Sequence, residues 1–290
     1  MRAPTIAVAS GKGGTGKTTV SVNLARVSPP GALLLDCDVE EPNAHLFLAG
    51  RTVSSDTVTL PVPEVDRSLC NGCGECGRIC QFHAIVPLGT HPLVFPEMCH
   101  SCGGCALVCP HGAIREVDRR IGVVETLRAD HGTTLVQGRL DVGVVMAPPL
   151  IRAVKARVPD GHGAIIDAPP GTSCPVISAI RGADVVLLVT EPTPFGLHDL
   201  TLAVDTVRQL RMPFAVLVNR MGVGDGRVRR YCESEGIRIV GTIPDDRRIA
   251  EAYSRGEAIV DALPEYRGLF ADLLAALNDL ALTARREYAS

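Results

Sequence analysis

A glycine-rich loop near the start of the chain restricts the possible folds more than any other sequence feature. Residues 11–18 fit the pattern G-x4-G-K-[ST], between an apolar run at 5–9 and a helix predicted at 17–27. In such a loop the backbone N–H groups point at phosphate, the lysine reaches the β and γ phosphates, and the hydroxyl binds Mg²⁺. The residues predicted to bind nucleotide here are Gly11, Gly13, Gly14, Thr15, Gly16, Lys17, Thr18 and Thr19. The loop therefore predicts a strand–loop–helix unit of a parallel α/β sheet.

The same loop also fits the dinucleotide fingerprint G-x-G-x-x-G, with Asp36 twenty residues after its last glycine. A dinucleotide loop has no use for the lysine and hydroxyl of Lys17 and Thr18, so the phosphate-loop interpretation is preferred. A purely structural glycine loop is the third alternative. Lysine is rare in this chain, since Lys12, Lys17 and Lys155 are the only lysines among 29 basic residues. Two of them in one loop indicate a need for a compact ammonium group beside phosphate.

Short apolar strands alternate with helix-length segments at both ends of the chain. Strands are predicted at 32–36, 163–167, 185–190, 214–219 and 237–241, and helices from 226, at 247–255 and from 264. Strands that alternate with helices form βαβ units around a mainly parallel sheet. The predicted fold class is therefore α/β, with helices on both faces of the sheet as in P-loop NTPases.

Eight of the 11 cysteines occur in two copies of C-x2-C-x2-C-x3-C that start 29 residues apart. This is the spacing of bacterial two-cluster ferredoxins, in which the fourth cysteine of each run ligates the other cluster. The predicted ligands are Cys70, Cys73, Cys76 and Cys109 for cluster 1, and Cys99, Cys102, Cys105 and Cys80 for cluster 2. Zinc sites instead show two C-x2-C pairs that are separated by a loop. Two [4Fe–4S] clusters are therefore predicted.

The cysteine-rich centre of the chain is loop-rich and interrupts the βαβ pattern. It predicts an inserted, small ferredoxin-like α+β domain at 61–118 that metal holds together, because so short a segment cannot build a large core. The nucleotide-binding domain is then discontinuous and comprises 1–60 and 119–290.

Acidic and amide side chains follow three of the predicted strands. Asp167 precedes a Pro-Pro-Gly turn and is the predicted acid near Mg²⁺, the alternative being a loop cap. Asp36 and Asp38 flank Cys37, and either carboxylate could orient the attacking water. Asn219 could contact the base. The guanine-reading pattern Asn-Lys-x-Asp is not found at this position, so ATP is favoured over GTP.

Composition and charge limit the kinds of partner and the cellular location that we expect for this protein. The net charge of −3 is too close to neutral to indicate nucleic acid as a partner. No apolar run approaches the roughly 18–20 residues of a membrane span, and the C-terminal helix carries a leucine face typical of packing on a sheet. The N-terminus does not resemble a signal peptide. We expect a cytoplasmic protein with no nucleic-acid partner and no stable membrane insertion.

Taken together, these motifs resemble those of the MinD-superfamily P-loop ATPases (the ParA, MinD and nitrogenase iron-protein-like group), with an inserted two-cluster ferredoxin domain. Apart from the cysteine runs, the resemblance rests on the segments 12–18, 36–43, 167–171, 174–177, 190–199 and 243–246. The first of these segments has the deviant Walker A form, which adds a second, earlier lysine at Lys12.

The resemblance implies an ATP-dependent homodimer in which two nucleotides lie face to face and Lys12 reaches the partner's phosphates. It further implies that Asp38 positions water, that Asp167 holds Mg²⁺ through a water, and that Asn219 and Pro244 contact adenine. The predicted catalytic residues are Lys12, Lys17 and Asp38, and the expected activity is slow, partner-stimulated ATP hydrolysis.

Three cysteines lie outside the two runs. Cys232 is predicted to be a helix residue without a role. Cys37 and Cys174 each lie beside a predicted nucleotide-site acid, and packing is favoured for both because small buried cysteines pack well. In nitrogenase iron-protein-like relatives a cysteine at the offset of Cys174 helps bind a metal site shared across the dimer, which stays an alternative here.

Three functions fit these features. The first is an ATPase that couples nucleotide-driven switch changes to electron transfer through its two clusters, towards a redox or metallocofactor-assembly partner. The second is an assembly or carrier ATPase for clusters or metal. The third is a spatial-organising ATPase with structural clusters. Full four-cysteine ligation argues against labile cargo, and the first function is preferred.

Overall fold

A mainly parallel nine-stranded sheet forms the centre of the protein, with the strand order β11-β10-β9-β1-β8-β2-β7-β6-β3. The computed structural model describes residues 3–289, with side chains from 3 to 286. The strands are β1 (Ile6–Ala9), β2 (Leu33–Asp36), β3 (Gly50–Val65), β6 (Ile114–Ala129), β7 (Thr134–Leu140), β8 (Ile165–Asp167), β9 (Val185–Thr190), β10 (Phe214–Met221) and β11 (Ile239–Pro244). The six pairings from β11 to β7 are parallel, and β6 and β3 add two antiparallel pairings at one edge.

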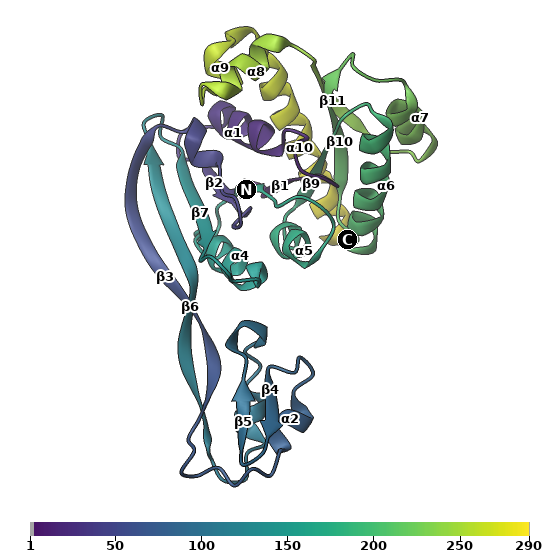
Figure 1. Cartoon of the computed structure of the whole chain (residues 1–290). Helices are drawn as coiled ribbons and strands as arrows, with labels where there is room; N and C mark the ends of the chain where they lie inside the picture. Colours follow the sequence, from purple (N-terminus) through teal and green to yellow (C-terminus); the bar gives the residue numbers. More distant parts are fainter. Residues whose placement is uncertain (1–2, 290) are drawn as a thin grey trace.

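Helices cover both faces of this sheet (Figure 1). One face is covered by α1 (Lys17–Val27), α8 (Arg247–Ser254), α9 (Ile259–Ala262) and α10 (Arg267–Ala289). The other is covered by α4 (Ala147–Lys155), α5 (Cys174–Ile180), α6 (Pro194–Gln209) and α7 (Arg227–Ser234). Each face has its own large cluster of buried apolar side chains. The predicted fold class is thus confirmed, and we call this part of the chain the body.

The C-terminal helix packs on the sheet as predicted. It follows a short 3-10 turn, η3 (Pro264–Tyr266), and buries Phe270, Leu273 and Leu277 against the body. Among the described residues, no helix is both long and apolar enough to cross a membrane.

Two long strands join the body to the cysteine-rich segment. β3 and β6 pair antiparallel from Gly50↔Ala129 to Val65↔Ile114, and Figure 1 shows them leaving the sheet as a twisted arm. The sequence does not predict these strands, because most side chains of β3 are exposed and form no apolar run. The predicted domain boundaries at 60/61 and 118/119 fall inside the arm.

The segment 66–113 forms a small module at the far end of the arm (Figure 1). It consists of two short helices, a two-stranded hairpin and a 3-10 turn: α2 (Glu75–Ile79), α3 (Gly104–Leu107), β4 (Ile85–Leu88), β5 (His91–Val94) and η2 (Pro96–Met98). Its buried apolar cluster contains Cys76 and Ile85 of the module together with Ile114, the first residue of β6. So small a core contributes little to stability by itself.

Candidate functional site

The glycine loop lies between β1 and α1, at the carboxyl edge of the parallel sheet. Two of its glycines are fixed by close approach. A Cβ on Gly11 would lie 2.1 Å from the backbone oxygen of Asp199, and one on Gly16 would lie 2.4 Å from Nδ2 of Asn219. Gly16 also has φ of 94°, a left-handed conformation that larger residues rarely adopt. The loop is therefore packed tightly against α6 and against β10 near its carboxyl end.

A cavity of about 450 Å³ opens beside this loop, a volume within the usual range for small-molecule sites. The loop side is lined by Gly13, Gly14, Gly16, Lys17, Thr18 and Thr19. Across from it the lining includes Asp38, Pro170, Asn219, Pro244 and Asp246. Neither Gly11, Lys12 nor Thr15 lines the cavity. The structure thus brings most of the predicted nucleotide residues to one place and leaves Lys12 outside it.

Asp167 is the last residue of β8, and it is almost fully buried and does not itself line the cavity. Its Oδ1 accepts a hydrogen bond from the Ser21 hydroxyl at 3.0 Å, whereas its buried Oδ2 has no hydrogen-bond partner among the described residues. Burial raises the pKa of Asp167 to about 6, against the opposing influence of Thr18 and Lys17. An unpartnered buried carboxylate oxygen beside a threonine hydroxyl fits a hydrated Mg²⁺.

Lys17 is the other charged group in the floor of the site, and it is also buried. Burial lowers the pKa of its ammonium, and the charges of Asp167 and Asp38 partly offset that effect. Its Nζ lies 3.5 Å from the backbone oxygen of Lys12. The ammonium is therefore held within the loop, where a bound phosphate would be.

The two aspartates at the end of β2, Asp36 within the strand and Asp38 just after it, have different environments. Asp36 is fully buried, and its carboxylate accepts backbone N–H bonds from Asp38, Asn43 and Ala44 at 3.1, 2.9 and 3.0 Å. Asp38 lines the cavity, and burial, with the nearby charge of Asp167, raises its pKa to about 6. Asp36 thus organises the loop that carries Asp38, and Asp38 is the one that faces the cavity.

Asn219 both lines the cavity and supports the glycine loop. Its Nδ2 donates to the backbone oxygen of Thr15 at 2.8 Å, and its Oδ1 accepts from the Arg220 N–H at 2.9 Å. Pro244 is an exposed part of the same wall. The side-chain amide of Asn219 therefore has a structural partner in addition to any contact with a base.

The sequence reasoning missed Glu191, which follows β9 and is buried. It lies 3.6 Å from Nζ of Lys12 and 2.9 Å from Nη1 of Arg220. Because β9 pairs with β1, the residue after β9 reaches the glycine loop. Its position at a strand end is the sequence signal that could have identified it.

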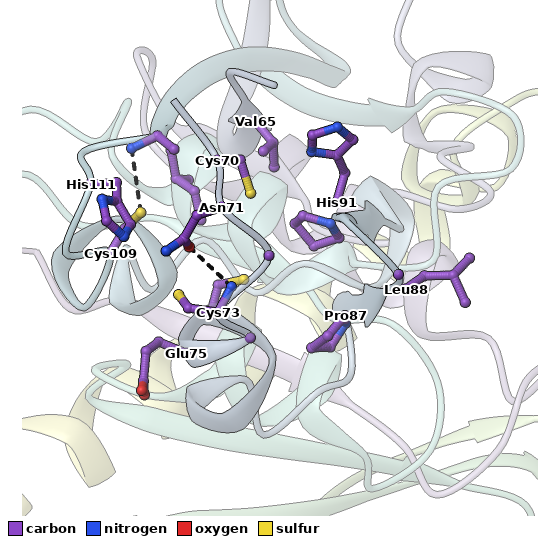
Figure 2. A pocket seen from close by; sticks show the side chains of 17 residues that line it. Val65, Cys70, Asn71, Cys73, Glu75, Pro87, Leu88, His91, Cys109 and His111 are labelled. Atoms are coloured by element: carbon purple, nitrogen blue, oxygen red, sulfur yellow. Dashed lines mark hydrogen bonds between the residues drawn. The ribbon is translucent and has the colours of Figure 1, made fainter. Parts of the chain in front are cut away.

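The eight regularly spaced cysteines line two separate cavities in the module. The first cavity is lined by Cys70, Cys73, Cys76 and Cys109, and the second by Cys80, Cys99, Cys102 and Cys105. Figure 2 shows the first cavity, with Cys70, Cys73 and Cys109 around it. The last cysteine of each run therefore lies with the first three of the other run, which is the crossed arrangement expected from the spacing.

Backbone N–H groups point at the sulfurs in both cavities. The Ala113 N–H donates to Sγ of Cys109 and the Ala84 N–H donates to Sγ of Cys80, each at 3.3 Å. Hydrogen bonds of this kind stabilise thiolates and tune iron–sulfur centres. Each run is followed by Ala-Ile at the same offset, and these small and apolar side chains are buried beside the cavities.

The thiol groups do not converge as they would around one ion. Within residues 3–286, no group of three or more His, Cys, Asp or Glu side chains is placed to hold a single metal ion. In a [4Fe–4S] cluster each cysteine binds a different iron atom, so four thiols around a cavity suit it better than a single zinc ion.

The second cavity is the one nearer the body. Its lining includes Pro63 and Glu116 of the arm, whereas the first cavity is lined by Val65 and Ile114, two residues further along. Cys99 also lines a crevice with Val144, ahead of α4. The two cysteine sets are therefore arranged in order along the arm, one nearer the body and one further from it.

The remaining cysteines lie in the body. Cys37 and Cys232 are fully buried in the apolar core, and burial raises the pKa of both thiols. Cys174 is the first residue of α5 and is exposed.

The strand order, the glycine loop and its cavity define the class of P-loop nucleotide-binding proteins. The sequence matches the CobQ/CobB/MinD/ParA nucleotide binding domain over residues 6–259, and the chain belongs to that family. The phosphate-loop interpretation of residues 11–18 is thereby confirmed.

Relatives by sequence and by structure agree with this assignment. The chain is 30% identical to an uncharacterized protein of Methanocaldococcus jannaschii, over 88% of this chain and 91% of that protein. It is 26% identical to an iron-sulfur cluster carrier protein of Aquifex aeolicus, over 90% of this chain and 62% of that protein.

Solved structures of MinD proteins have the same fold. The septum site-determining protein MinD of Pyrococcus horikoshii, complexed with Mg-ADP, aligns with a TM-score of 0.57 and 21% identity over 97% of this chain and 98% of that one. The cell division ATPase MinD of Pyrococcus furiosus aligns with a TM-score of 0.59 and 20% identity over 96% and 99% of the two chains.

Proposed function

We propose that this protein hydrolyses ATP and couples its nucleotide state to electron transfer, through two [4Fe–4S] clusters, towards a partner protein. The observation that carries the proposal is the arrangement of the eight cysteines as two complete sets of four, one nearer the body and one further along the arm. Two neighbouring sites of this kind suit the relay of single electrons between a donor protein and the partner protein.

In the nucleotide site, Lys17 contacts the β and γ phosphates, and Thr18 holds Mg²⁺ together with Asp167, which acts through a water. The unpartnered Oδ2 of Asp167 supports this role. Asp38 orients the attacking water, since it is the aspartate that lines the cavity. Asn219 and Pro244, across the cavity from the loop, contact adenine.

We also propose that the active form is an ATP-dependent homodimer with the two nucleotides face to face. Lys12 supports this because its side chain lies outside its own cavity, 3.6 Å from Glu191. An ammonium group outside its own cavity can serve the phosphates of a second subunit. Turnover is expected to be slow and to be stimulated by the partner protein.

In the module, Cys70, Cys73, Cys76 and Cys109 hold one cluster, and Cys80, Cys99, Cys102 and Cys105 hold the other. Each cluster supplies reversible one-electron chemistry when bound. Cys73 and Cys102, the second cysteine of each run, are exposed and mark where each site is open to a partner.

The connection between the two sites runs through the loop that Asp36 holds. This loop carries Asp38 in the nucleotide cavity and leads through η1 (Ala44–Phe47) directly into the arm at Gly50. The other strand of the arm, β6, pairs with β7, which in turn pairs with β2. A loop that is reordered by γ-phosphate can move whatever is attached to it, and here that is the arm.

A carrier function for iron–sulfur clusters is the second candidate, since relatives in Aquifex and Pyrococcus are named iron-sulfur cluster carrier proteins. Four thiols per cavity would saturate a cubane cluster and leave no iron open for hand-over. This favours resident clusters over cargo.

The two candidates differ in what ATP changes. Anaerobically purified protein is expected to hold about eight iron atoms per chain. Adding Mg·ATP should shift the cluster potentials or the rate of their reoxidation in the wild type, but not in Lys17→Ala. Transfer of iron to an apo-ferredoxin on adding Mg·ATP, with no change in redox behaviour, would instead support the carrier function.

A further inference from the structure

Lys12 has its backbone inside the glycine loop and its side chain outside it. Its backbone oxygen accepts hydrogen bonds from the Ser10 hydroxyl at 2.5 Å and from Nζ of Lys17 at 3.5 Å. Its own ammonium group lies 3.6 Å from Oε2 of Glu191, and the Lys12 side chain is one-third exposed. The side chain is thus paired with a carboxylate and not with the phosphate-binding cavity.

Glu191 has a second cationic partner. Its Oε1 lies 2.9 Å from Nη1 of Arg220, which follows Asn219 in β10. Each carboxylate oxygen therefore faces a different cation, and the contact with Arg220 is the shorter of the two. The Glu191 side chain is only 11% exposed.

This arrangement decides which ion pair can open. A carboxylate this deeply buried is costly to leave without a partner. If Lys12 moves away, Arg220 still neutralises Glu191, so the departure of Lys12 does not strand a buried charge. If Arg220 were removed, the carboxylate would have Lys12 as its only cation and would retain it.

We propose that Glu191 holds Lys12 in the nucleotide-free subunit and releases it to the partner's phosphates when the ATP dimer forms, while Arg220 retains the Glu191 charge. Glu191 acts through Lys12 and is a positioning residue. The inference rests on the proposed ATP-dependent homodimer. It identifies the Lys12–Glu191 ion pair of the nucleotide-free subunit as a contact that sets how readily the dimer forms.

The test compares the dimer dissociation constants of two variants, measured by sedimentation with Mg²⁺ and the β,γ-imido analogue of ATP. Glu191→Gln should lower the constant roughly three- to tenfold, because Lys12 is no longer held back. Arg220→Gln should raise it by a similar factor, because Lys12 is held more firmly. Binding of the analogue to the isolated subunit, measured at low protein concentration, separates these effects from changes in nucleotide affinity.

Two further measurements tie the effects to Lys12. First, the changes in the dimer dissociation constant caused by Glu191→Gln and by Arg220→Gln should disappear when either variant is combined with Lys12→Gln. In the wild type, a carbodiimide should form an amide between Lys12 and Glu191 that mass spectrometry detects, and the analogue should suppress it.

The possible outcomes separate this inference from the proposed function. If the wild type dimerises, and neither variant dimerises more tightly than the wild type, the holding role of Glu191 is overturned. The proposed ATP-dependent dimer would still stand. The same follows if the cross-link persists fully in the dimer. A wild type that never dimerises with the analogue would overturn the proposed dimer, and this inference with it.

Discussion

The body and the module hold together by different means. In the body, both faces of a nine-stranded sheet bury extensive apolar clusters. The module contributes only Cys76 and Ile85 to its buried cluster, which Ile114 of the arm completes. Burial of apolar area is the main favourable term in folding, so the side chains of the body can stabilise it, whereas we expect the module to need metal–thiolate bonds.

The body and the module also differ in how many large apolar side chains they expose to solvent. Eight of the sixteen large apolar side chains that the described residues expose lie within 66–113, which is about one-sixth of the chain. They are Leu69, Ile79, Phe82, Val86, Leu88, Leu93, Met98 and Leu107. A unit of this size cannot turn all of its apolar residues inward. We therefore expect the two regions to respond separately to most changes.

The largest effect should come from the phosphate lysine. Lys17→Ala removes the buried ammonium from the nucleotide cavity and should weaken nucleotide binding at least about 100-fold. Iron content should not change, because the cysteine cavities do not include this residue. Calorimetry with ATP and iron analysis of the same preparation would measure both quantities.

Lys12→Ala is the matched control, and it should retain nucleotide binding while it loses dimerisation. Parallel loss of iron in Lys17→Ala would contradict the independence of the two regions.

The next effect is on the pH dependence of hydrolysis. The pKa of Asp38 is raised to about 6, first by burial and then by the charge of Asp167, against the pull of Lys17. The Asp38 carboxylate, which we propose orients the attacking water, is therefore protonated as the pH falls below about 6. The rate of ATP hydrolysis should decline about tenfold per pH unit there. Steady-state hydrolysis at saturating Mg·ATP between pH 5 and 8 would show it. Asp38→Asn should be slow at every pH, and a wild-type rate that rises on acidification would rule out this role.

Loss of one ligand should halve the iron content. Cys76→Ser should leave about four of about eight iron atoms per chain, with nucleotide binding intact. Cys80→Ser is the informative counterpart, because Cys80 lies with the cysteines of the other run. The remaining cluster should differ between the two variants in its electron paramagnetic resonance spectrum. Identical spectra would contradict the crossed ligand sets, and stoichiometric zinc would contradict electron transfer.

The smallest effect should be confined to the stability of the body. Nζ of Lys155 donates to the backbone oxygens of Ser178, Ala179 and Arg181 at 2.9, 2.8 and 2.6 Å, and so binds α4 to the end of α5. Lys155→Met should lower the free energy of unfolding of the body by about 1–3 kcal/mol, as expected for hydrogen bonds from a charged donor. Urea denaturation followed by far-UV circular dichroism would measure it. Lys155→Arg should lose less, and the iron content of both variants should match that of the wild type.

The sequence by itself determined the features that depend on spacing along the chain. The loop at 11–18 can bind phosphate because neighbouring backbone groups supply the contacts, and the strand before it and the helix after it are local consequences. The two cysteine runs likewise carry their grouping in their spacing. The apolar strands β8, β9 and β10 were predictable because parallel strands are buried on both faces.

Only the tertiary structure decided what depends on residues far apart in the sequence. β3 and β6 stabilise each other by antiparallel pairing and show no apolar pattern of their own, so the arm was not predictable. Asp36 and Asp38 look equivalent in the sequence, and the path of the loop at 38–44 alone buries one and exposes the other to the cavity. Lys12 meets Glu191 only because β9 pairs with β1. The arm and the Lys12–Glu191 pair depend on segments far apart in the sequence, whereas the two aspartates depend on the three-dimensional path of a nearby loop.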